Sequence, residues 1–382
     1  MIPGEIADYR ELARRRLPRF LFEYIDGGAG AQTTLRHNVS DFEQVKLRQR
    51  VMRDVSKLDL STTLFGQPLS MPVALAPVGL SGLYARRGEC QAAKAAERAG
   101  IRMSLSTLSL CGVEEVSRAT GDPIWFQLYM IKDRGFMRDM LARARESGCS
   151  VLLFTVDLPV AGARWADART GLANGHLPAA QFERMKAMAA RPGWLWNVGL
   201  MGQPHDFGNV APAMGKGGVR EFWRWVGASF DTTVTWKDMD WVREHWDRPM
   251  VIKGVLDPED ARASVAAGAD GIVVSNHGGR QLDGVSSTIA ALPKIADAVG
   301  DKTTVLLDGG VRCGTDVVRA LALGAKGVLI GRPWAYALAA RGGAGVSAML
   351  EQFRKEIGIT LALAGVPDVK MLGRDALDAQ EN

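Results

Sequence analysis

The residues best suited to chemistry form one short segment, Ser275-Asn276-His277-Gly278-Gly279-Arg280-Gln281, directly after an apolar stretch. Histidine exchanges a proton close to neutral pH, so His277 is a candidate base. The two glycines beside it would let a ligand approach the backbone closely. A loop histidine is more often structural or solvated. The catalytic interpretation gains weight from polar residues that folding could bring near it: Tyr24, Tyr129, Asp157, Arg164 and Arg280.

Eight short apolar segments recur from residue 71 onward, and most are separated by a polar or glycine-rich loop and an amphipathic helix. Their consecutive apolar residues are typical of parallel strands that are buried on both faces. Eight such units favour a TIM (β/α)8 barrel over a doubly wound sheet, which usually has fewer strands. The expected strands are residues 72–76, 103–106, 124–129, 151–156, 250–253, 271–275, 304–308 and 327–331.

The rest of the chain is expected to surround that barrel within a single domain. Residues 1–70 would form a helical segment ending in a strand pair near 62–69, which closes the bottom of the barrel. Residues 71–340 would form the barrel, and 341–382 a C-terminal helix and tail. After the fourth strand the pattern breaks, from about 165 to 236, into Gly-, Pro-, Met- and Trp-rich sequence. A long insertion there would be a lid, a partner surface or a membrane contact.

Small or polar residues end every predicted strand, where TIM barrels hold their functional groups. Glycine-rich turns after the seventh and eighth strands would let backbone N–H groups converge on a phosphate, with Arg312 and Arg332 neutralising it. A dinucleotide-like fragment at 343–348 follows a helix, so a mononucleotide is favoured. Lys253 would need an anionic partner. The strand-end residues are Pro77, Val78, Gly79, Ser106, Gln127, Tyr129, Thr155, Asp157, Lys253, Ser275, Asp308, Gly309, Gly310, Arg312, Gly331 and Arg332.

Composition narrows the class of protein. Of the 382 residues 47% are hydrophobic and 23% charged, as in a soluble globular protein with an ample core. The net charge of +5 favours anionic partners, but the basic residues are dispersed, so nucleic acid binding is not expected. The four cysteines form no CxxC pair and do not cluster with the five histidines, so disulfides and metal are not expected and a reducing cytosol fits best. No apolar signal core or membrane span is apparent.

Specific motifs extend along the chain from about Asp8 to Ala364. They are SNHGGRQLD at 275–283, FEYIDGGA at 22–29, PVALAPVG at 72–79, LSTLS at 105–109, WFQLY at 125–129, FTVDLPVAGAR at 154–164 and LLDGGVRCGTDVVRALALGA at 306–325. Together they resemble the FMN-dependent L-2-hydroxy acid oxidising enzymes, a family that includes glycolate oxidase, L-lactate dehydrogenase and mandelate dehydrogenase. LRQRVMRDVS, MPVALAPVGLSGLYARRGE and RPMVIKGVLDPEDA are most similar to its bacterial respiratory L-lactate dehydrogenases.

The resemblance implies a role for each site residue. His277 would take a proton from the substrate, while Asp157 orients it and stabilises the imidazolium. The substrate carboxylate and hydroxyl would be held by Arg164, Arg280, Tyr24 and Tyr129. The FMN ring and ribityl chain would contact Pro77, Val78, Gly79, Ser106, Gln127, Thr155, Lys253 and Ser275. The ribityl and phosphate end would contact Asp308, Gly309, Gly310, Arg312, Gly331 and Arg332.

The resemblance also implies oxidation of L-lactate to pyruvate, with the electrons passed to a membrane quinone. Oxidation of mandelate or another 2-hydroxy acid, and an oxidase that uses oxygen, stay open, as do hydride and carbanion mechanisms. The pocket lining near Gly79, Ser81, Leu110 and Val160 would decide between the 2-hydroxy acids. Gly79 favours a dehydrogenase, because oxidases such as glycolate oxidase carry alanine there. Trp194, Trp196, Trp223 and Trp225 suit either a membrane surface or packing of the insertion onto the barrel. A homotetramer, peripheral on the cytoplasmic face of the membrane, is the expected state.

Overall fold

A computed structural model describes residues 2–172, 177–214 and 219–378 of the chain, with the backbone alone at 219–223. Eight parallel strands close into a barrel in the order β10-β3-β4-β5-β6-β7-β8-β9, so the first and last strands of the series pair with each other. The predicted TIM barrel is confirmed, and each strand agrees with its prediction to within two residues. The strands are β3 (Val73–Leu75), β4 (Arg102–Ser106), β5 (Trp125–Tyr129), β6 (Val151–Thr155), β7 (Met250–Val255), β8 (Gly271–Val274), β9 (Thr304–Asp308) and β10 (Gly327–Ile330).

The interior of the barrel is a compact apolar core. Alternate residues of the strands point inward, and the inward set is mostly Val and Leu with Trp125 as its largest member. The antiparallel pair β1 (Thr62–Leu64) and β2 (Gln67–Leu69) adds Leu64 and Leu69 to this core. Phe65, in the turn between them, meets the ring of Trp125 edge-on at 5.7 Å. The predicted strand pair therefore closes the N-terminal end of the barrel, which leaves the other end for ligands.

Helices cover the outside of the barrel because the outward face of each strand is also apolar. Helix α13 begins as its sequence favours, because the side chain of Asp257 accepts a hydrogen bond from the amide of Glu259 and Pro258 occupies the first turn. The helices around the barrel are α4 (Gly88–Arg98), α5 (Val113–Arg118), α6 (Arg134–Glu146), α12 (Asp238–His245), α13 (Pro258–Ala266), α14 (Thr288–Val299), α15 (Gly314–Ala322) and α16 (Arg332–Ala364).

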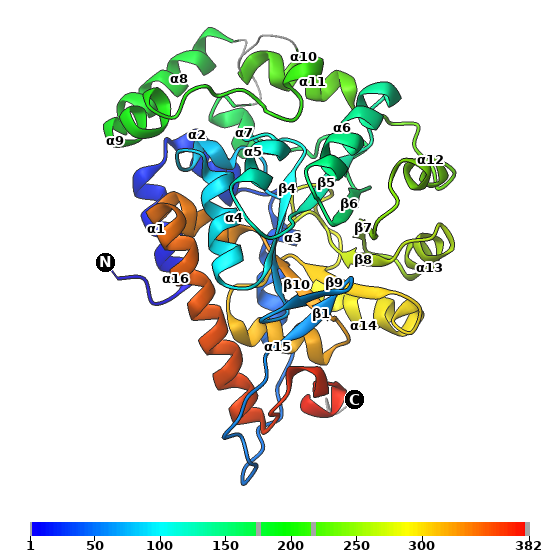
Figure 1. Cartoon of the computed structure of the whole chain (residues 1–382). Helices are drawn as coiled ribbons and strands as arrows, with labels where there is room; N and C mark the ends of the chain where they lie inside the picture. The colour runs from blue at the N-terminus through cyan, green and yellow to red at the C-terminus, as the bar shows by residue number, and fades with distance from the viewer. Residues whose placement is uncertain (1, 173–176, 215–218, 379–382) are drawn as a thin grey trace.

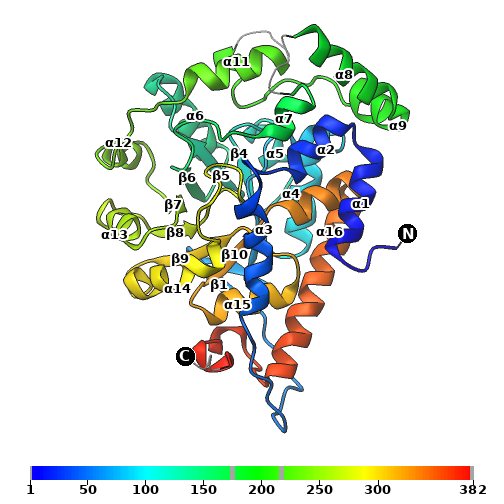
Figure 2. The ribbon, with the colours of Figure 1, turned by 180° about the vertical axis from the view of Figure 1, so that it is seen from behind.

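The ends of the chain pack against each other beside the barrel. Helix α1 (Ile6–Arg16) lies along α16, which is interrupted by non-helical backbone at Arg341 and Gly342 (Figures 1 and 2). The fragment at 343–348 lies in the part of α16 that follows this interruption. Helices α2 (Arg19–Asp26) and α3 (Thr33–Ser40) continue along the barrel, and the amide of Ala29 between them donates to the carbonyl of Gly279 at 2.9 Å.

The insertion after β6 forms a helical cap. In Figures 1 and 2 its helices lie at one end of the molecule, opposite the hairpin β1-β2 and the C-terminus. The indole N–H of Trp194 donates to the carbonyl of Leu83, at 2.7 Å, and the amide of Lys132 donates to the carbonyl of Ser229, at 2.8 Å. The cap consists of α7 (Trp165–Arg169), α8 (Pro178–Ala189), α9 (Pro192–Trp194), η3 (Leu195–Leu200), α10 (Ala211–Met214) and α11 (Val219–Ser229).

The tryptophans of the cap have different environments. Trp194 is held by its hydrogen bond, and Trp225 meets the ring of Phe136 edge-on at 6.2 Å. Trp196 is 65% exposed, whereas the side chain of Trp223 lies outside the described residues. The sequence left open whether these tryptophans pack the insertion onto the barrel or face a membrane surface. Trp194 and Trp225 pack the cap onto the barrel, whereas Trp196 faces outward. No described helix is long and apolar enough to cross a membrane.

Candidate active site

A deep pocket opens at the carboxyl ends of the strands, under the cap. Eighteen of the twenty predicted site residues line it, and the other two, Asp157 and Ser275, lie directly behind His277 and Lys253. The remaining lining residues come from strand ends, from the loops that follow them and from α2, α11 and α16. They are Ile25, Ala76, Tyr84, Leu108, Leu158, Ala161, Val226, Phe230, Gly278, Val311, Leu329, Ile330 and Ala335.

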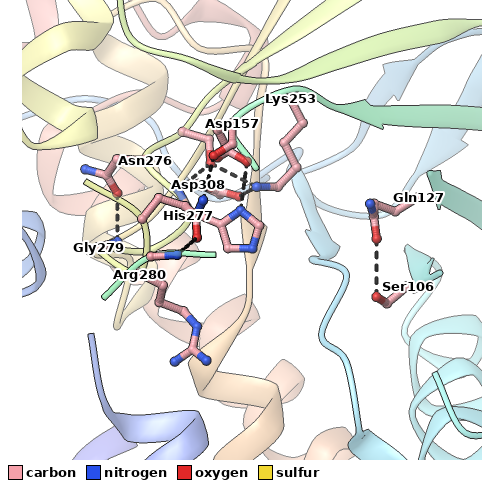
Figure 3. A network of polar contacts seen from close by, with 12 residues as sticks. Ser106, Gln127, Asp157, Lys253, Asn276, His277, Gly279, Arg280 and Asp308 are labelled. Atoms are coloured by element: carbon pink, nitrogen blue, oxygen red, sulfur yellow. Dashed lines mark hydrogen bonds and ion pairs between the residues drawn. The ribbon is translucent and has the colours of Figure 1, made fainter. Parts of the chain in front are cut away.

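His277 projects into this pocket from the loop after β8, with Asp157 from the end of β6 behind it (Figure 3). The Nδ1 atom of His277 lies 2.8 Å from Oδ1 of Asp157. An ionised carboxylate only accepts hydrogen bonds, so Nδ1 carries the hydrogen and Nε2 keeps its lone pair. His277 has a left-handed backbone, φ +57°, which its amide contact with Ser275 Oγ at 3.1 Å helps to hold. The side chain is thereby fixed as a proton acceptor.

Charges around this pair set its protonation. Burial lowers the pKa of His277 below its usual value, and Asp157 only partly opposes the effect, while Lys253 and Arg164 reinforce it. Burial would raise the pKa of Asp157, but the charge and hydrogen bond of His277, with Lys253, hold it below the usual value. At neutral pH the imidazole is neutral and the carboxylate ionised, which is the state that a base requires.

A backbone irregularity makes room for Asp157. The register between β7 and β8 shifts between Lys253 and Val255, and Gly254 in the gap has φ +113°. A Cβ atom at Gly254 would lie 2.6 Å from that of Asp157, so only glycine fits. This requirement was not predicted, although an isolated glycine inside a strand pattern is a known sign of a bulge.

Two partly buried guanidinium groups face the same space. The Nη1 atom of Arg280 donates to the carbonyls of Tyr24, at 2.6 Å, and Gly27, at 2.7 Å, and its guanidinium lies over the Tyr24 ring. Arg164 Nε donates to the Arg280 carbonyl at 3.3 Å, and its ion pair with Asp167 is long, 3.9 Å. Burial and the charge of Arg280 lower the pKa of Arg164. Both groups would be stabilised by an anion such as a carboxylate.

Lys253 is held as a cation deeper in the pocket. Its Nζ atom donates to Ser275 Oγ and lies 2.9 Å from an Asp308 carboxylate oxygen. Burial by itself would lower the pKa of Lys253, but the carboxylates of Asp308 and Asp157 raise it above the usual value. An ammonium group has three N–H bonds, so one remains for a ligand after these two contacts. The anionic partner expected for Lys253 is in part supplied by the protein.

Several buried polar atoms of the pocket have no partner in the described protein. They are Nε2 of Gln127, Oγ1 of Thr155 and Oδ1 of Asp308, and buried polar atoms normally make hydrogen bonds. All three residues line the pocket. A ligand with several hydrogen-bonding atoms would satisfy them.

The far end of the pocket is glycine-rich and cationic. Gly309 and Gly310 have φ +89° and +88°, and a Cβ atom at Gly310 would lie 1.7 Å from the carbonyl oxygen of Asn38. Burial lowers the pKa of Arg332 to about 9, and its guanidinium donates to the carbonyls of Ile25, Gly27 and Gly278. With Arg312 also on this wall, a phosphate group would find both charge and backbone access there.

The chain matches the model of the FMN-dependent dehydrogenase family over residues 13–379. It belongs to this family. FMN has a polar heteroaromatic ring and a phosphate tail, which fits the unpartnered polar atoms at one end of the pocket and the arginines at the other.

Individual relatives agree with this assignment. The chain is 58% identical to an L-lactate dehydrogenase of Caulobacter sp. strain K31 over 378 residues, 99% of both chains. It is 56% identical to an L-lactate dehydrogenase of Acinetobacter baumannii strain AYE, covering 99% of this chain and 98% of that protein. Among solved structures, a monotopic membrane (S)-mandelate dehydrogenase superimposes with a TM-score of 0.92 at 34% identity, covering 100% of both chains. A mandelate oxidase gives a TM-score of 0.84 at 37% identity, with 98% of each chain covered.

Some contacts of the FMN-dependent dehydrogenase site were missed in the sequence. Asn38 and Asn276 exchange two side-chain hydrogen bonds of 2.8 Å, which join α3 to the His277 loop. The Nε2 atom of Gln281 donates to the carbonyl of Asp157 at 2.8 Å. The hydroxyl of Tyr84 donates to the carbonyl of Gly79. The sequence around Asn276 does not indicate that its side chain would bind Asn38, which is more than 200 residues away.

Other contacts correct the sequence analysis. The substrate end was expected to be near Gly79, Ser81, Leu110 and Val160, but of these only Gly79 lines the pocket. Ser81 and Leu110 are buried elsewhere, and Val160 is 63% exposed. The apolar residues that line it from the loops after β4 and β6 and from the cap are Leu108, Leu158, Ala161, Val226 and Phe230.

Replacing Gly331 tests whether this end of the pocket holds FMN. A Cβ atom there would lie 3.8 Å from the Cβ of Ala76, an ordinary contact, so Gly331→Ala should not disturb the protein itself. Because the methyl group would reduce the space between backbone and phosphate, we expect FMN to bind about tenfold more weakly, about 1.4 kcal/mol. Titration of apoprotein with FMN measures this. Gly193→Ala, with no atom near its added Cβ, is the control; unchanged affinity in Gly331→Ala would contradict the assignment.

Proposed function

We propose that this FMN-dependent dehydrogenase oxidises L-lactate to pyruvate. The observation that carries the proposal is the neutral His277, held by Asp157 at 2.8 Å and facing the space next to two partly buried arginines. That arrangement suits a small acid with a removable proton near its carboxylate. The relatives at 56–58% identity bear the name L-lactate dehydrogenase, which supports lactate among the 2-hydroxy acids.

The protein groups divide the work as follows. Arg164 and Arg280 bind the substrate carboxylate, and the hydroxyls of Tyr24 and Tyr129 hydrogen-bond the carboxylate and the substrate hydroxyl. Burial raises the pKa of Tyr129, so its hydroxyl stays protonated and can donate. The Nε2 atom of His277 takes a proton from the substrate, and the charge of Asp157 stabilises the resulting imidazolium. Phe230, whose ring lies 5.0 Å from that of Tyr129, covers the site from the cap.

FMN, when bound, supplies an acceptor for the two electrons that leave the substrate. Residues that hold its ring and ribityl chain are Pro77, Val78, Gly79, Ser106, Gln127, Thr155, Lys253 and Ser275. Residues that hold the ribityl and phosphate end are Asp308, Gly309, Gly310, Arg312, Gly331 and Arg332. The charge of Lys253 lies among these groups and would favour an electron-rich ring.

His277→Gln tests the assigned base. Glutamine keeps hydrogen-bonding capacity but cannot take a full proton, so FMN content should persist while bleaching of the flavin by L-lactate slows about 10²- to 10⁴-fold. Anaerobic stopped-flow absorbance measures the rate. His245→Gln is the matched control, because His245 stacks on Trp241 far from the pocket lining.

The pH dependence provides an independent check of the same base. Only the neutral imidazole accepts a proton, so kcat/KM should fall as the pH decreases through the pKa of His277. Because burial lowers this pKa, the midpoint of the fall should lie below 6.5 in the free enzyme. Bleaching at the full rate in His277→Gln, or a midpoint above 6.5, would show that another group is the base.

The electron acceptor that we propose is a membrane quinone. Gly79 leaves space beside the pocket, since an added Cβ would meet nothing closer than the Leu108 carbonyl at 3.4 Å. We expect steady-state turnover with a soluble quinone analogue to exceed turnover with oxygen alone by at least about tenfold. Oxygen uptake and peroxide formation, measured with L-lactate, glycolate and L-mandelate as substrates, check both acceptor and substrate. Fast peroxide production would indicate an oxidase. A preference for mandelate would show that L-lactate is not the main substrate.

An exposed apolar face on the cap supports a position at the membrane surface. It consists of Leu177, Phe182, Met185, Leu195, Trp196, Leu200 and Met201, whose exposed fractions run from 37% to 65%. Monomeric soluble proteins rarely expose so many large apolar residues together. A neighbour in structure is a monotopic membrane protein. We propose that this face rests on the cytoplasmic side of the cell membrane, where quinone is within reach. The homotetramer expected from the family resemblance remains a prediction.

Vesicle binding tests this face. Phe182→Ser with Trp196→Ser should weaken co-sedimentation with vesicles of phosphatidylethanolamine and phosphatidylglycerol by at least about tenfold, because each side chain contributes about 1.5–3 kcal/mol when buried in an apolar phase. Ile359→Ser with Leu363→Ser is the matched control, since these residues are 59% and 58% exposed on α16. Equal loss in both double variants, or no binding by the unaltered protein, would refute the membrane contact.

A further inference from the structure

Two cysteines from different segments meet beside the barrel. Cys90 lies in the first turn of α4 and Cys111 in the loop between β4 and α5. Their sulfur atoms and a carboxylate oxygen of Glu115 all lie within 4.8 Å of one another. Cys111 is fully buried, whereas Cys90 is partly accessible to solvent. None of these three residues lines the substrate and FMN pocket.

The two thiols differ in their electrostatic surroundings. A hydrogen bond with Cys111 lowers the pKa of Cys90. Burial and the charge of Glu89 oppose this effect, and the cations Arg87 and Lys94 support it, so the pKa lies below its usual value. The same hydrogen bond and burial raise the pKa of Cys111. Thiolate, not thiol, is the nucleophile, so Cys90 is the more reactive of the two and Cys111 the one positioned to react second.

We propose that Cys90 and Cys111 form a reversible peroxide-sensitive disulfide site in this enzyme. The thiolate of Cys90 attacks one oxygen of hydrogen peroxide, which breaks the O–O bond and gives a sulfenic acid and hydroxide. The hydroxide takes up the proton that Cys90 released on ionising and becomes water. The sulfur of Cys111 then displaces hydroxide from the sulfenic acid, so the S–S bond forms, and the thiol proton of Cys111 leaves with that hydroxide as a second water. Two thiols are oxidised and one peroxide is reduced to two waters. A dithiol reductant reverses the reaction.

A metal ion is the alternative occupant of the same three residues, and the charges disfavour it. Arg87 Nε donates to Glu115 at 2.6 Å, and the two side chains form an ion pair. A divalent ion would have to displace the Arg87 guanidinium from the Glu115 carboxylate, or bind that carboxylate beside the guanidinium charge. It would also need the buried Cys111 to ionise, against its raised pKa. Disulfide formation leaves the ion pair of Arg87 with Glu115 in place, and Cys111 loses its proton only as its sulfur attacks the sulfenic acid.

The location of the pair couples it to the active site. Glu89, next to Cys90, accepts hydrogen bonds from the amides of Gly82, at 2.8 Å, and Leu110, at 3.0 Å. Leu110 precedes Cys111 in a loop whose Leu108 lines the pocket. The sulfur atoms of a disulfide are about 2 Å apart, so oxidation would draw α4 and this loop together. We expect L-lactate turnover to fall severalfold in the oxidised enzyme and to recover on reduction.

Peptide mapping of the purified holoenzyme tests the proposal. After treatment with hydrogen peroxide and alkylation, trypsin should release a linked pair made of residues 88–94 and 103–118. The alkylatable thiols should fall from four to two, because the chain has four free cysteines. Dithiothreitol should restore both thiols. Neither Cys90→Ser nor Cys111→Ser should give the linked pair, whereas Cys313→Ser, which removes a partly accessible cysteine elsewhere, should still give it.

Other outcomes would overturn the proposal. One is oxidation of Cys90 to sulfinic or sulfonic acid without any linked peptide, which would show that Cys111 cannot reach it. Another is stoichiometric zinc in the purified enzyme that is lost in Cys90→Ser, which would assign the residues to a metal. These measurements read covalent structure and metal content, so they do not depend on the substrate or acceptor of the enzyme.

Discussion

The contact between His277 and Asp157 sets the requirements for much of the surrounding structure. A buried carboxylate is stable only if positive charge and hydrogen bonds compensate it, and here His277 and Lys253 do so. Lys253 in turn needs Asp308 from β9, on the far side of β8. The network in Figure 3 thus joins the ends of four adjacent strands, β6 to β9, and each strand must have its correct register for the charges to balance.

The excess charge in the pocket explains why substrate and cofactor should both be anions. Arg164, Arg280 and Arg332 are held mainly by carbonyl oxygens, which satisfy hydrogen bonds but carry no full charge. A carboxylate near the first two and a phosphate near the third would each neutralise a buried cation. The lowered pKa of Arg332 reflects the cost of holding such a cation, which comes first from burial and then from the charges of Arg280 and Arg312, and a bound anion would reduce that cost.

The barrel could be predicted from the sequence because its signals are local. A run of apolar residues marked each strand. Because the strands of a barrel are parallel, the residues that follow these runs all lie at its carboxyl end. The residues of the pocket could therefore be listed from the sequence. Contacts between distant loops had no such signal. Cys90 and Cys111 are only 21 positions apart, yet neither CxxC spacing nor periodicity indicates that α4 faces the loop before α5. The cap was recognised by its broken pattern, but which of Trp194 and Trp196 faces outward depends on packing.

Barrel closure by β10 against β3 also has a consequence for synthesis of the protein in a cell. About 250 residues separate Val73 from its partner Val328. At ribosomal rates of roughly 5–20 residues per second, β3 waits on the order of 10–50 seconds for the strand that completes its ladder. The cap, with its exposed Phe182 and Trp196, is made well before that moment. An early encounter of the nascent cap with a membrane or chaperone would therefore shield apolar surface while the barrel is still open.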